Sequence, residues 1–411
     1  MASSTAPGFG LEARSEADRR DERPGDCDAR NTGGTPSRTA ANPPPLSPDR
    51  YLGAFREHRR YLNFASLGPA SEPVIEAGDR LNRAAALADT ASERLLALQQ
   101  PRALASLARL SGFREENITL VPNTSSSLVQ VAMGLPEGTR VVAGGYQFPA
   151  NVWPWRNAAT GGRTTAHFIG ALDEPVTPEL VAANLGASTD VVSISAVDFR
   201  TGYRADLARI REAIGDRLLV VDAIQAFGVV EEDWTLADVV VAGGQKWMRA
   251  GQGTGFMALS DRALERLLPL AANWAGIEDS LDLHRERHVP RHGAARFDAT
   301  RLSPVLAGCF AEALELIEGV GPGWVATEIA ARYSLIENLA ARNGLRVLSE
   351  REPARRAGIA VIEAPSPEAA LRAAEAGFSF TRHDALRLRF SLHASTRPAA
   401  IEELVSVLAG T

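Results

Sequence analysis

Between Asn117 and Leu259, short apolar runs alternate with stretches of helical patterning, and this alternation most constrains the fold. Strands that alternate with helices predict a mostly parallel sheet with helices on both faces. The predicted strands are Ile118–Val121, Arg140–Ala143, Thr165–Ile169, Val191–Ser195, Leu218–Val221, Val239–Val241 and Gly255–Leu259. We therefore expect an α/β protein whose large domain, residues 49–300, contains a mostly parallel seven-stranded sheet. Its first part, residues 49–115, is expected to supply a leading segment and helices.

A smaller α+β domain is expected over residues 301–411. A helix from about Ser303 to Glu318 should end at the Gly321-Pro-Gly turn, and a second should run from about Trp324 to Asn343. The remaining predicted elements are strands at Leu345–Leu348, Ala357–Glu363 and Ala385–Ser391 and a helix at Pro398–Leu408.

The composition excludes several kinds of partner. Residues 1–48 contain hardly any large apolar side chain, so we predict a disordered tail there. The net charge is only −6 and no long basic run is present, which argues against a nucleic-acid partner. The longest apolar stretch, 218–230, is too short to span a bilayer, and the N-terminus lacks an apolar signal core. We expect a cytoplasmic protein that contacts neither nucleic acid nor membrane.

Lysine usage points to one special position. Of the 44 basic residues only Lys246 is a lysine, and the others are arginines. Arginine replaces lysine wherever only a cation is needed, but a guanidinium stays protonated and cannot form a Schiff base. Chance survival on a solvated surface is the alternative. However, Lys246 follows a buried apolar strand and lies in a glycine-rich loop, which favours an amine that attacks a carbonyl.

Two further motifs follow predicted strands. In Val121-Pro-Asn-Thr-Ser-Ser-Ser, hydroxyl residues open a helix, and a helix start with free N–H groups and hydroxyls can bind phosphate. An ordinary capped helix gives the same pattern. The aromatic cluster from Tyr146 to Trp155 offers a ring that can stack on a flat cofactor, or that packs in a core or interface.

A carboxylate ends the most apolar strand. Asp222 closes Leu-Leu-Val-Val-Asp, and Gln225 follows three residues later. In a pyridoxal 5′-phosphate (PLP) site such a carboxylate keeps the pyridine nitrogen protonated, and the glutamine can donate to the phenolic oxygen. An aspartate that caps the next helix is the alternative. The four motifs in this order, together with the single lysine, favour the PLP interpretation.

The motif order resembles a known family. Asn-Thr-Ser, Phe-Pro-x-Asn, Val-Asp-x-x-Gln-Ala-x-Gly and Gly-x-Lys-Trp-Met-x-Ala-x-x-Gly-Thr-Gly-Phe resemble the class V aminotransferase or cysteine desulfurase-like branch of fold-type I PLP-dependent enzymes. The lysine motif looks most like isopenicillin N epimerase-like members, whereas Phe-Pro-Ala-Asn and Ser195-Ala-Val-Asp-Phe-Arg-Thr-Gly look kynureninase-like. The resemblance spans about Tyr61 to Leu408. It implies a PLP cofactor and a homodimer with the active site at the subunit interface.

The resemblance also implies roles for individual residues. Lys246 would be the Schiff-base lysine and Asp222 the pyridinium partner, and these two are the expected catalytic residues. Phe148 falls where the ring-stacking residue sits, a position that desulfurases usually fill with histidine. The implied cofactor-binding residues are Thr124, Ser125, Phe148, Asp222, Gln225, Gln245 and Lys246.

The substrate carboxylate has two candidate partners. Arg389 matches the arginine that grips the α-carboxylate in the family, and bidentate geometry suits it. Arg387, two residues earlier on the same strand face, is the rival.

The reaction stays open at this stage. Cys309 lies in an apolar helix, so we expect a core residue and no persulfide relay. His284, His288 and His292 are interrupted by proline and arginine, and no metal site is expected. The leading hypothesis is β-elimination by a C–S lyase on a cysteine conjugate in a specialised pathway. An aminotransferase, an epimerase and a decarboxylating oxidative deaminase are the alternatives, and an inactive binding module is disfavoured by the intact motifs.

Overall fold

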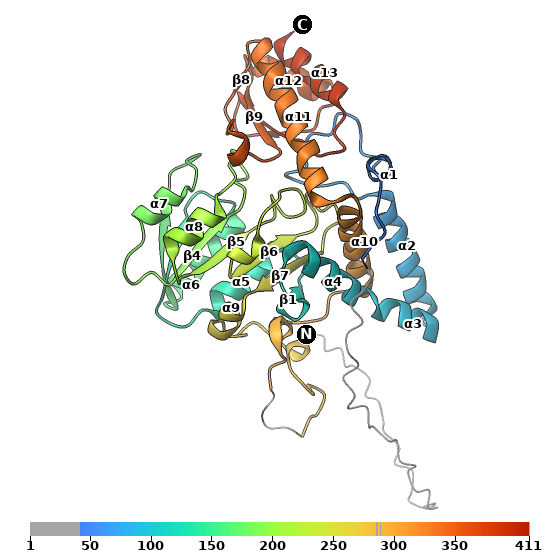
Figure 1. Cartoon of the computed structure of the whole chain (residues 1–411), viewed down its shortest axis with the longest axis vertical. Helices are drawn as coiled ribbons and strands as arrows, with labels where there is room; N and C mark the ends of the chain where they lie inside the picture. Colours follow the sequence, from blue (N-terminus) through green and yellow to red (C-terminus); the bar gives the residue numbers. More distant parts are fainter. Residues whose placement is uncertain (1–41, 285–286, 288, 411) are drawn as a thin grey trace, which may run out of the picture. The chain divides into compact units, whose positions relative to one another are not determined.

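The structure is a computed structural model, and it describes residues 42–284, 287 and 289–410 (Figure 1). Of the predicted disordered tail, 1–48, residues 1–41 lie outside the described residues. Beyond that point, the backbone N–H of Leu46 donates to the carbonyl of Gly319 over 2.7 Å. Helix α1 begins directly afterwards and spans Pro48–Gly53. The proposed boundaries at residues 48 and 300 stay predictions.

The large sheet has the predicted mixture of directions. Its order is β1-β7-β6-β5-β4-β2-β3, with the five strands from β6 to β3 parallel, and β7 antiparallel to both β6 and β1 (Figure 1). A mostly parallel seven-stranded sheet is therefore confirmed. The strands are β1 (Ile118–Leu120), β2 (Thr139–Gly144), β3 (Thr164–Ile169), β4 (Val191–Ser195), β5 (Leu218–Asp222), β6 (Val239–Gly243) and β7 (Gly255–Leu259).

Helices cover both faces of this sheet. Residues of α4, α8 and α10 share one apolar core with it, and residues of α5, α6 and α9 share the other. The helices up to residue 320 are α2 (Glu72–Leu87), α3 (Thr90–Ala97), α4 (Gln99–Ser111), α5 (Thr124–Gly134), α6 (Trp153–Thr160), α7 (Pro178–Ala183), α8 (Leu207–Ile214), α9 (Asp261–Arg266) and α10 (Pro304–Val320). Short 3-10 turns lie at Glu115–Asn117, Pro149–Asn151, Trp234–Leu236, Trp274–Gly276, Gly293–Phe297 and Pro353–Arg355.

The central strands show why the sheet needs cover on both sides. In β5, Leu219 and Val221 belong to the core on one face, while Leu218 and Val220 belong to the core on the other. Successive side chains of a strand point to opposite faces, so a continuous apolar run buries both. This burial explains why β5 and β6 read as unbroken apolar runs.

The C-terminal region forms a second, four-stranded sheet of order β10-β11-β9-β8, in which all pairs are antiparallel. Its two-residue strand β10 and helix α12 were not predicted, because so short a strand leaves no periodicity to read. Helix α10, assigned to this region by the sequence, packs against α2 and α4 (Figure 1). The elements are α11 (Pro322–Arg342), β8 (Arg346–Val347), β9 (Ile359–Glu363), α12 (Pro367–Glu375), β10 (Thr381–Arg382), β11 (Arg387–Ser391) and α13 (Pro398–Ala409).

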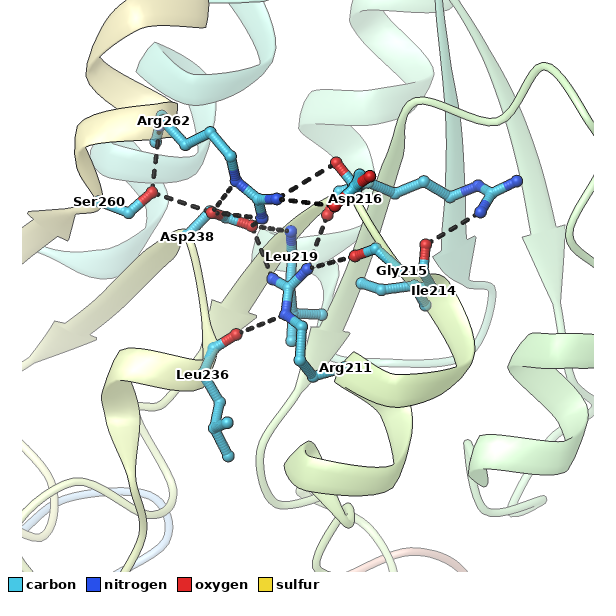
Figure 2. A network of polar contacts seen from close by, with 11 residues as sticks. Arg211, Ile214, Gly215, Asp216, Leu219, Leu236, Asp238, Ser260 and Arg262 are labelled. Carbon is cyan, nitrogen blue, oxygen red and sulfur yellow. Dashed lines mark hydrogen bonds and ion pairs between the residues drawn. The ribbon is translucent and has the colours of Figure 1, made fainter.

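A polar network fixes the amino-terminal ends of the central parallel strands (Figure 2). Asp238, just before β6, accepts the backbone N–H of Leu219 in β5 over 2.8 Å. It also pairs with Arg211 over 2.6 Å and with Arg262 over 2.8 Å, and accepts the hydroxyl of Ser260 over 2.9 Å. One buried carboxylate thus ties β5, β6, the end of β7 and α8 together, at the edge opposite to the carboxyl ends.

Among the described residues, no helix is long and apolar enough to cross a bilayer. The cytoplasmic location stays a prediction.

Candidate active site

Asp222 and Lys246 lie at the carboxyl ends of neighbouring parallel strands. Asp222 is the last residue of β5, and Lys246 follows the end of β6 by three residues. Open α/β sheets bind ligands at this edge. The two charges are close enough for the carboxylate to raise the pKa of the amine and for the amine to lower that of the carboxyl.

The Lys246 side chain is buried beside an aromatic ring. It is 7% exposed, and its Nζ lies 5.0 Å from the ring centroid of Phe148. Burial lowers the pKa of the amine to about 8, Asp222 opposes this change, and the positive charge of Arg389 adds to it. A neutral amine is the form that attacks a carbonyl or accepts a proton, so burial prepares Lys246 for both roles.

Residues 61–69, which connect α1 to α2, fix the loop that carries Lys246. The backbone N–H of Gly68 donates to the carbonyl of Gln245 over 2.8 Å. A Cβ on Gly68 would lie 1.8 Å from the carbonyl oxygen of Lys246, so only glycine allows this approach. On the far side of the loop, the buried guanidinium of Arg249 pairs with Glu57 over 2.6 Å and donates to the carbonyl of Pro69 over 2.6 Å.

Asp222 is a buried carboxylate. It is 2% exposed and accepts the backbone N–H of Ile224 over 3.1 Å. Burial raises the pKa of this carboxyl to about 6, although the N–H of Ile224 and the charge of Lys246 both oppose the rise. A buried carboxylate of this kind favours a cationic partner.

Gln225 is oriented by two hydrogen bonds. Its Oε1 accepts the indole N–H of Trp247 over 2.7 Å, and its Nε2 donates to the carbonyl of Ala65 over 3.0 Å. An amide nitrogen carries two N–H groups, so one donor remains. Trp247 follows the lysine directly, and the indole therefore fixes which end of the Gln225 amide faces the site.

The start of α5 has the features of a phosphate cup. Asn123 caps the helix by accepting the N–H of Ser126 over 2.9 Å. Thr124 is buried, and its hydroxyl has no hydrogen-bond partner among the described residues; the same holds for Oε1 of Gln245. Rotating the side-chain amide of Gln245 by half a turn would place its NH₂ group where Oε1 now lies. Ser125, by contrast, is exposed.

Phe148, whose ring lies beside Lys246, packs against a second phenylalanine. Phe148, 40% exposed, meets Phe199 with ring centroids 5.3 Å apart and nearly perpendicular planes. Phe199 follows β4 and was quoted within a motif, but the sequence analysis gave it no role. Its place on the loop after a parallel strand is the signal that could have identified it.

The two candidate arginines have different surroundings. Arg389 is 4% exposed, forms no ion pair with a carboxylate among the described residues, and its Nε has no partner there. Burial lowers the pKa of this guanidinium to about 10, opposed by Asp198. Arg387 is more exposed and pairs with Asp384 and, over 2.8 Å, with Asp173. It lines a polar cavity of about 440 Å³ to which none of the expected cofactor-binding residues contributes.

The described residues contain no metal cluster, and the cysteine among them lies in a helix. No group of three metal-ligating side chains occurs among the described residues, and His288 lies outside them. Cys309, on α10, places its Sγ 3.7 Å from the carbonyl of Val74 on α2, and burial raises the pKa of its thiol.

The described groups fit PLP. Asp222 offers a carboxylate for the ring nitrogen, Gln225 a donor for the phenolic oxygen, and the start of α5 a cup for the phosphate. Lys246 offers the amine for covalent attachment, with the ring of Phe148 beside it. Such a site at the carboxyl edge of this mostly parallel sheet defines the fold-type I class of PLP-dependent enzymes.

Comparison with known proteins supports this class. The sequence model described as Aminotransferase class-V matches residues 83–372, and the chain belongs to this PLP-dependent family. PLP is accordingly its cofactor. An uncharacterized aminotransferase of Bacillus subtilis (strain 168) is 26% identical over 248 residues, which are 58% of this chain and 64% of that protein. Isopenicillin N epimerase of Streptomyces clavuligerus is 28% identical over 226 residues, 52% and 56% of the two chains. The matches therefore span less than two thirds of either relative.

Solved structures share the fold. The cystine C–S lyase C-DES, in complex with its product cysteine persulfide, superposes with a TM-score of 0.75 at 21% identity, covering 85% of this chain and 97% of that one.

Proposed function

We propose that the protein is a PLP-dependent enzyme acting on an α-amino acid, and that it catalyses β-elimination from a cysteine conjugate as a C–S lyase. The observation that carries the amino-acid assignment is the buried Arg389. The positive charge of Arg389 lowers the pKa of the Lys246 amine, and Arg389 forms no ion pair with a carboxylate among the described residues. A buried cation is costly unless paired, and an α-carboxylate supplies the missing anion.

Each expected site residue then has a role. Lys246 would hold the cofactor covalently, and its free amine would accept the Cα proton. Asp222 would pair with the protonated ring nitrogen, and bound PLP would supply the electron sink that acidifies the Cα–H bond. Phe148 would lie against the ring. Phosphate and phenolic-oxygen contacts come from Thr124, Ser125, Gln245 and Gln225.

The chemistry of the leaving group favours sulfur. In β-elimination the Cα proton goes to the amine of Lys246, and the Cβ–S bond breaks with its electron pair going to sulfur. A thiolate leaves without prior protonation, because a thiol has a pKa of about 8.5. The rings of Phe148 and Phe199, which contact each other, carry no proton donor, and as apolar groups they would suit a thioether substituent. Water then converts the remaining fragment to pyruvate and ammonia.

Two more observations support elimination over sulfur relay. Cys309 faces the backbone of α2 and has a raised thiol pKa, the opposite of what a nucleophilic thiolate needs. The fold neighbour C-DES is itself named as a cystine C–S lyase. An aminotransferase, an epimerase or a decarboxylating oxidative deaminase would use the same Cα chemistry and remain alternative outcomes of the test.

We further propose a homodimer. Large apolar side chains are exposed near Phe148 in the sequence, with Tyr146 54% exposed on the same loop and Trp153 58% exposed at the start of α6. A closed two-fold dimer would cover such side chains. Activity should then follow the dimer fraction as the protein is diluted.

The reaction is tested by incubating the PLP-loaded protein with S-substituted cysteines and with cystine. We expect equimolar thiol (or persulfide) and pyruvate, and none from Lys246→Ala. Loss of optical activity without pyruvate would identify an epimerase, and amino transfer to a 2-oxo acid an aminotransferase. Release of CO₂ with ammonia would identify the decarboxylating reaction. Any of these results without thiol would overturn the lyase assignment.

The carboxylate site is tested by a matched pair of variants. Arg389→Ala should raise KM about 10- to 100-fold, because a hydrogen bond to a charged group contributes about 1.5–3 kcal/mol. Arg387→Ala should leave KM close to the wild-type value. The reverse pattern would make Arg387 the carboxylate partner.

A further inference from the structure

Among the described residues, the hydrogen-bond partners of the Arg389 guanidinium are neutral oxygen atoms. Its Nη1 donates to the carbonyl of Phe199 over 2.7 Å, and its Nη2 donates to Ser66 Oγ over 2.8 Å and to Thr381 Oγ1 over 2.9 Å. Arginine has five N–H donors, so about two remain, and one of them is the buried Nε–H. Neutral acceptors direct the fork without cancelling its charge.

The two hydroxyl groups can accept from Arg389 only if their own protons point elsewhere. Both are directed to one atom: Ser66 donates to Asn63 Oδ1 over 2.9 Å, and Thr381 donates to the same oxygen over 3.0 Å. An amide oxygen has two lone pairs and accepts both. The two hydroxyl oxygens also lie within hydrogen-bonding distance of each other, 3.2 Å apart, and both accept from the same nitrogen of Arg389.

Asn63 is itself firmly placed. Its carbonyl accepts the N–H of Ser66 over 3.0 Å and of Leu67 over 3.2 Å, which closes a turn. Asn63 also forms a parallel bridge with Ser391, the last residue of the strand that carries Arg389. The bridge therefore ties the turn to the strand that carries the guanidinium.

We propose that Asn63 is a positioning residue for recognition of the substrate carboxylate. By accepting the hydroxyl protons of Ser66 and Thr381, it turns both oxygens toward Arg389 and leaves the Nε–H for the carboxylate. The proposal rests on the proposed role of Arg389, and Asn63 acts through that arginine without touching the substrate.

The test measures carboxylate recognition separately from overall binding. The PLP-loaded protein is titrated with L-alanine and with L-alaninamide, and binding is followed by the change in cofactor absorbance. The two probes share the amine and differ in the carboxylate. Asn63→Ala should lower the preference for L-alanine about tenfold, the size of one charge-assisted hydrogen bond, with L-alaninamide binding unchanged. Asn82→Ala, which removes an exposed asparagine on α2, is the matched control and should keep the preference.

A second pair of variants checks the hydroxyl directly. Thr381→Val keeps the shape and loses the acceptor, so it should lower the preference as Asn63→Ala does, and it serves if Asn63→Ala fails to fold. Thr381→Ser retains the hydroxyl and should restore the preference.

The outcomes separate the two proposals. If Arg389→Ala removes the preference while Asn63→Ala and Thr381→Val keep it, the positioning role is wrong and Arg389 stands. Equal weakening of both probes in Asn63→Ala would show a merely structural role and also overturn the proposal. If Arg389→Ala itself keeps the preference, the carboxylate site of the proposed function is wrong.

Discussion

Replacing Asp222 by asparagine should stabilise the cofactor-free protein while weakening the holoenzyme. The carboxyl is buried, and its pKa rises from 3.8 to about 6 on folding even with the attraction of Lys246 included. Each pKa unit corresponds to about 1.4 kcal/mol, so holding the charged form in the folded state costs about 3 kcal/mol. Asparagine has nearly the same shape and no charge, and it removes this cost.

The sign of the effect gives it a pH signature. Because the folded-state pKa is the higher one, the folded protein binds more protons than the unfolded chain between pH 3.8 and about 6. Stability of the wild type therefore falls as the pH rises through this window, and the cost is complete above it. The advantage of Asp222→Asn should be near zero at about pH 4 and about 3 kcal/mol at about pH 8.

Urea unfolding of cofactor-free wild type and variant at both pH values measures this difference. Effects of titrating groups that do not interact with Asp222 cancel between the two proteins, whereas Lys246, whose pKa Asp222 raises, keeps a smaller fraction of charged amine in the variant. With PLP bound, the order should reverse, because asparagine cannot hold the ring nitrogen protonated and turnover should fall by orders of magnitude. Equal destabilisation of the cofactor-free variant at both pH values would refute the claim that burial raises the pKa of Asp222 and costs stability.

Two further predictions concern single residues. Lys246 is the only lysine, and at pH 7 a pKa of about 8 leaves about a tenth of its amine neutral, against about one in three thousand for a free lysine. Reductive methylation of the cofactor-free protein, measured by mass spectrometry with Lys246→Arg as the control, should therefore have a midpoint near pH 8. A midpoint near pH 10 would contradict the effect of burial on this pKa. Cys309→Ala should cost about 1 kcal/mol of stability through a small cavity and leave thiol release unchanged; loss of turnover in the folded variant would revive sulfur relay.

The sheet could be predicted because its signal is local. The central strands β6 and β7 are apolar runs between turn or helix residues, and their burial on both faces excludes polar side chains. The positions of Asp222 and Lys246 followed from the same rule, since parallel strands end at one edge.

The surroundings of Arg389 could not be predicted, because they join residues far apart in the chain. Thr381 and Asn63 are 318 residues apart, and Thr381 lies in a strand of two residues. Residues 61–69 were interpreted only as a leading segment. Their contacts with Gln245, Gln225 and Arg389 depend on tertiary packing, which a single sequence does not reveal.

The two buried charges of the site are suited to charged groups that ligands would bring. Asp222 is a buried anion that meets a backbone N–H, and Arg389 is a buried cation that meets three neutral oxygens. Among the described residues neither charge forms an ion pair, although Lys246 attracts Asp222 and Asp198 attracts Arg389, so each costs folding energy. The protonated ring of PLP would pair with the first and an α-carboxylate with the second. Because ligand binding removes the free-energy cost of each buried charge, that cost adds to the affinity for the ligand. For this reason the same substitution, Asp222→Asn, should stabilise the cofactor-free protein and hold PLP in the wrong protonation state.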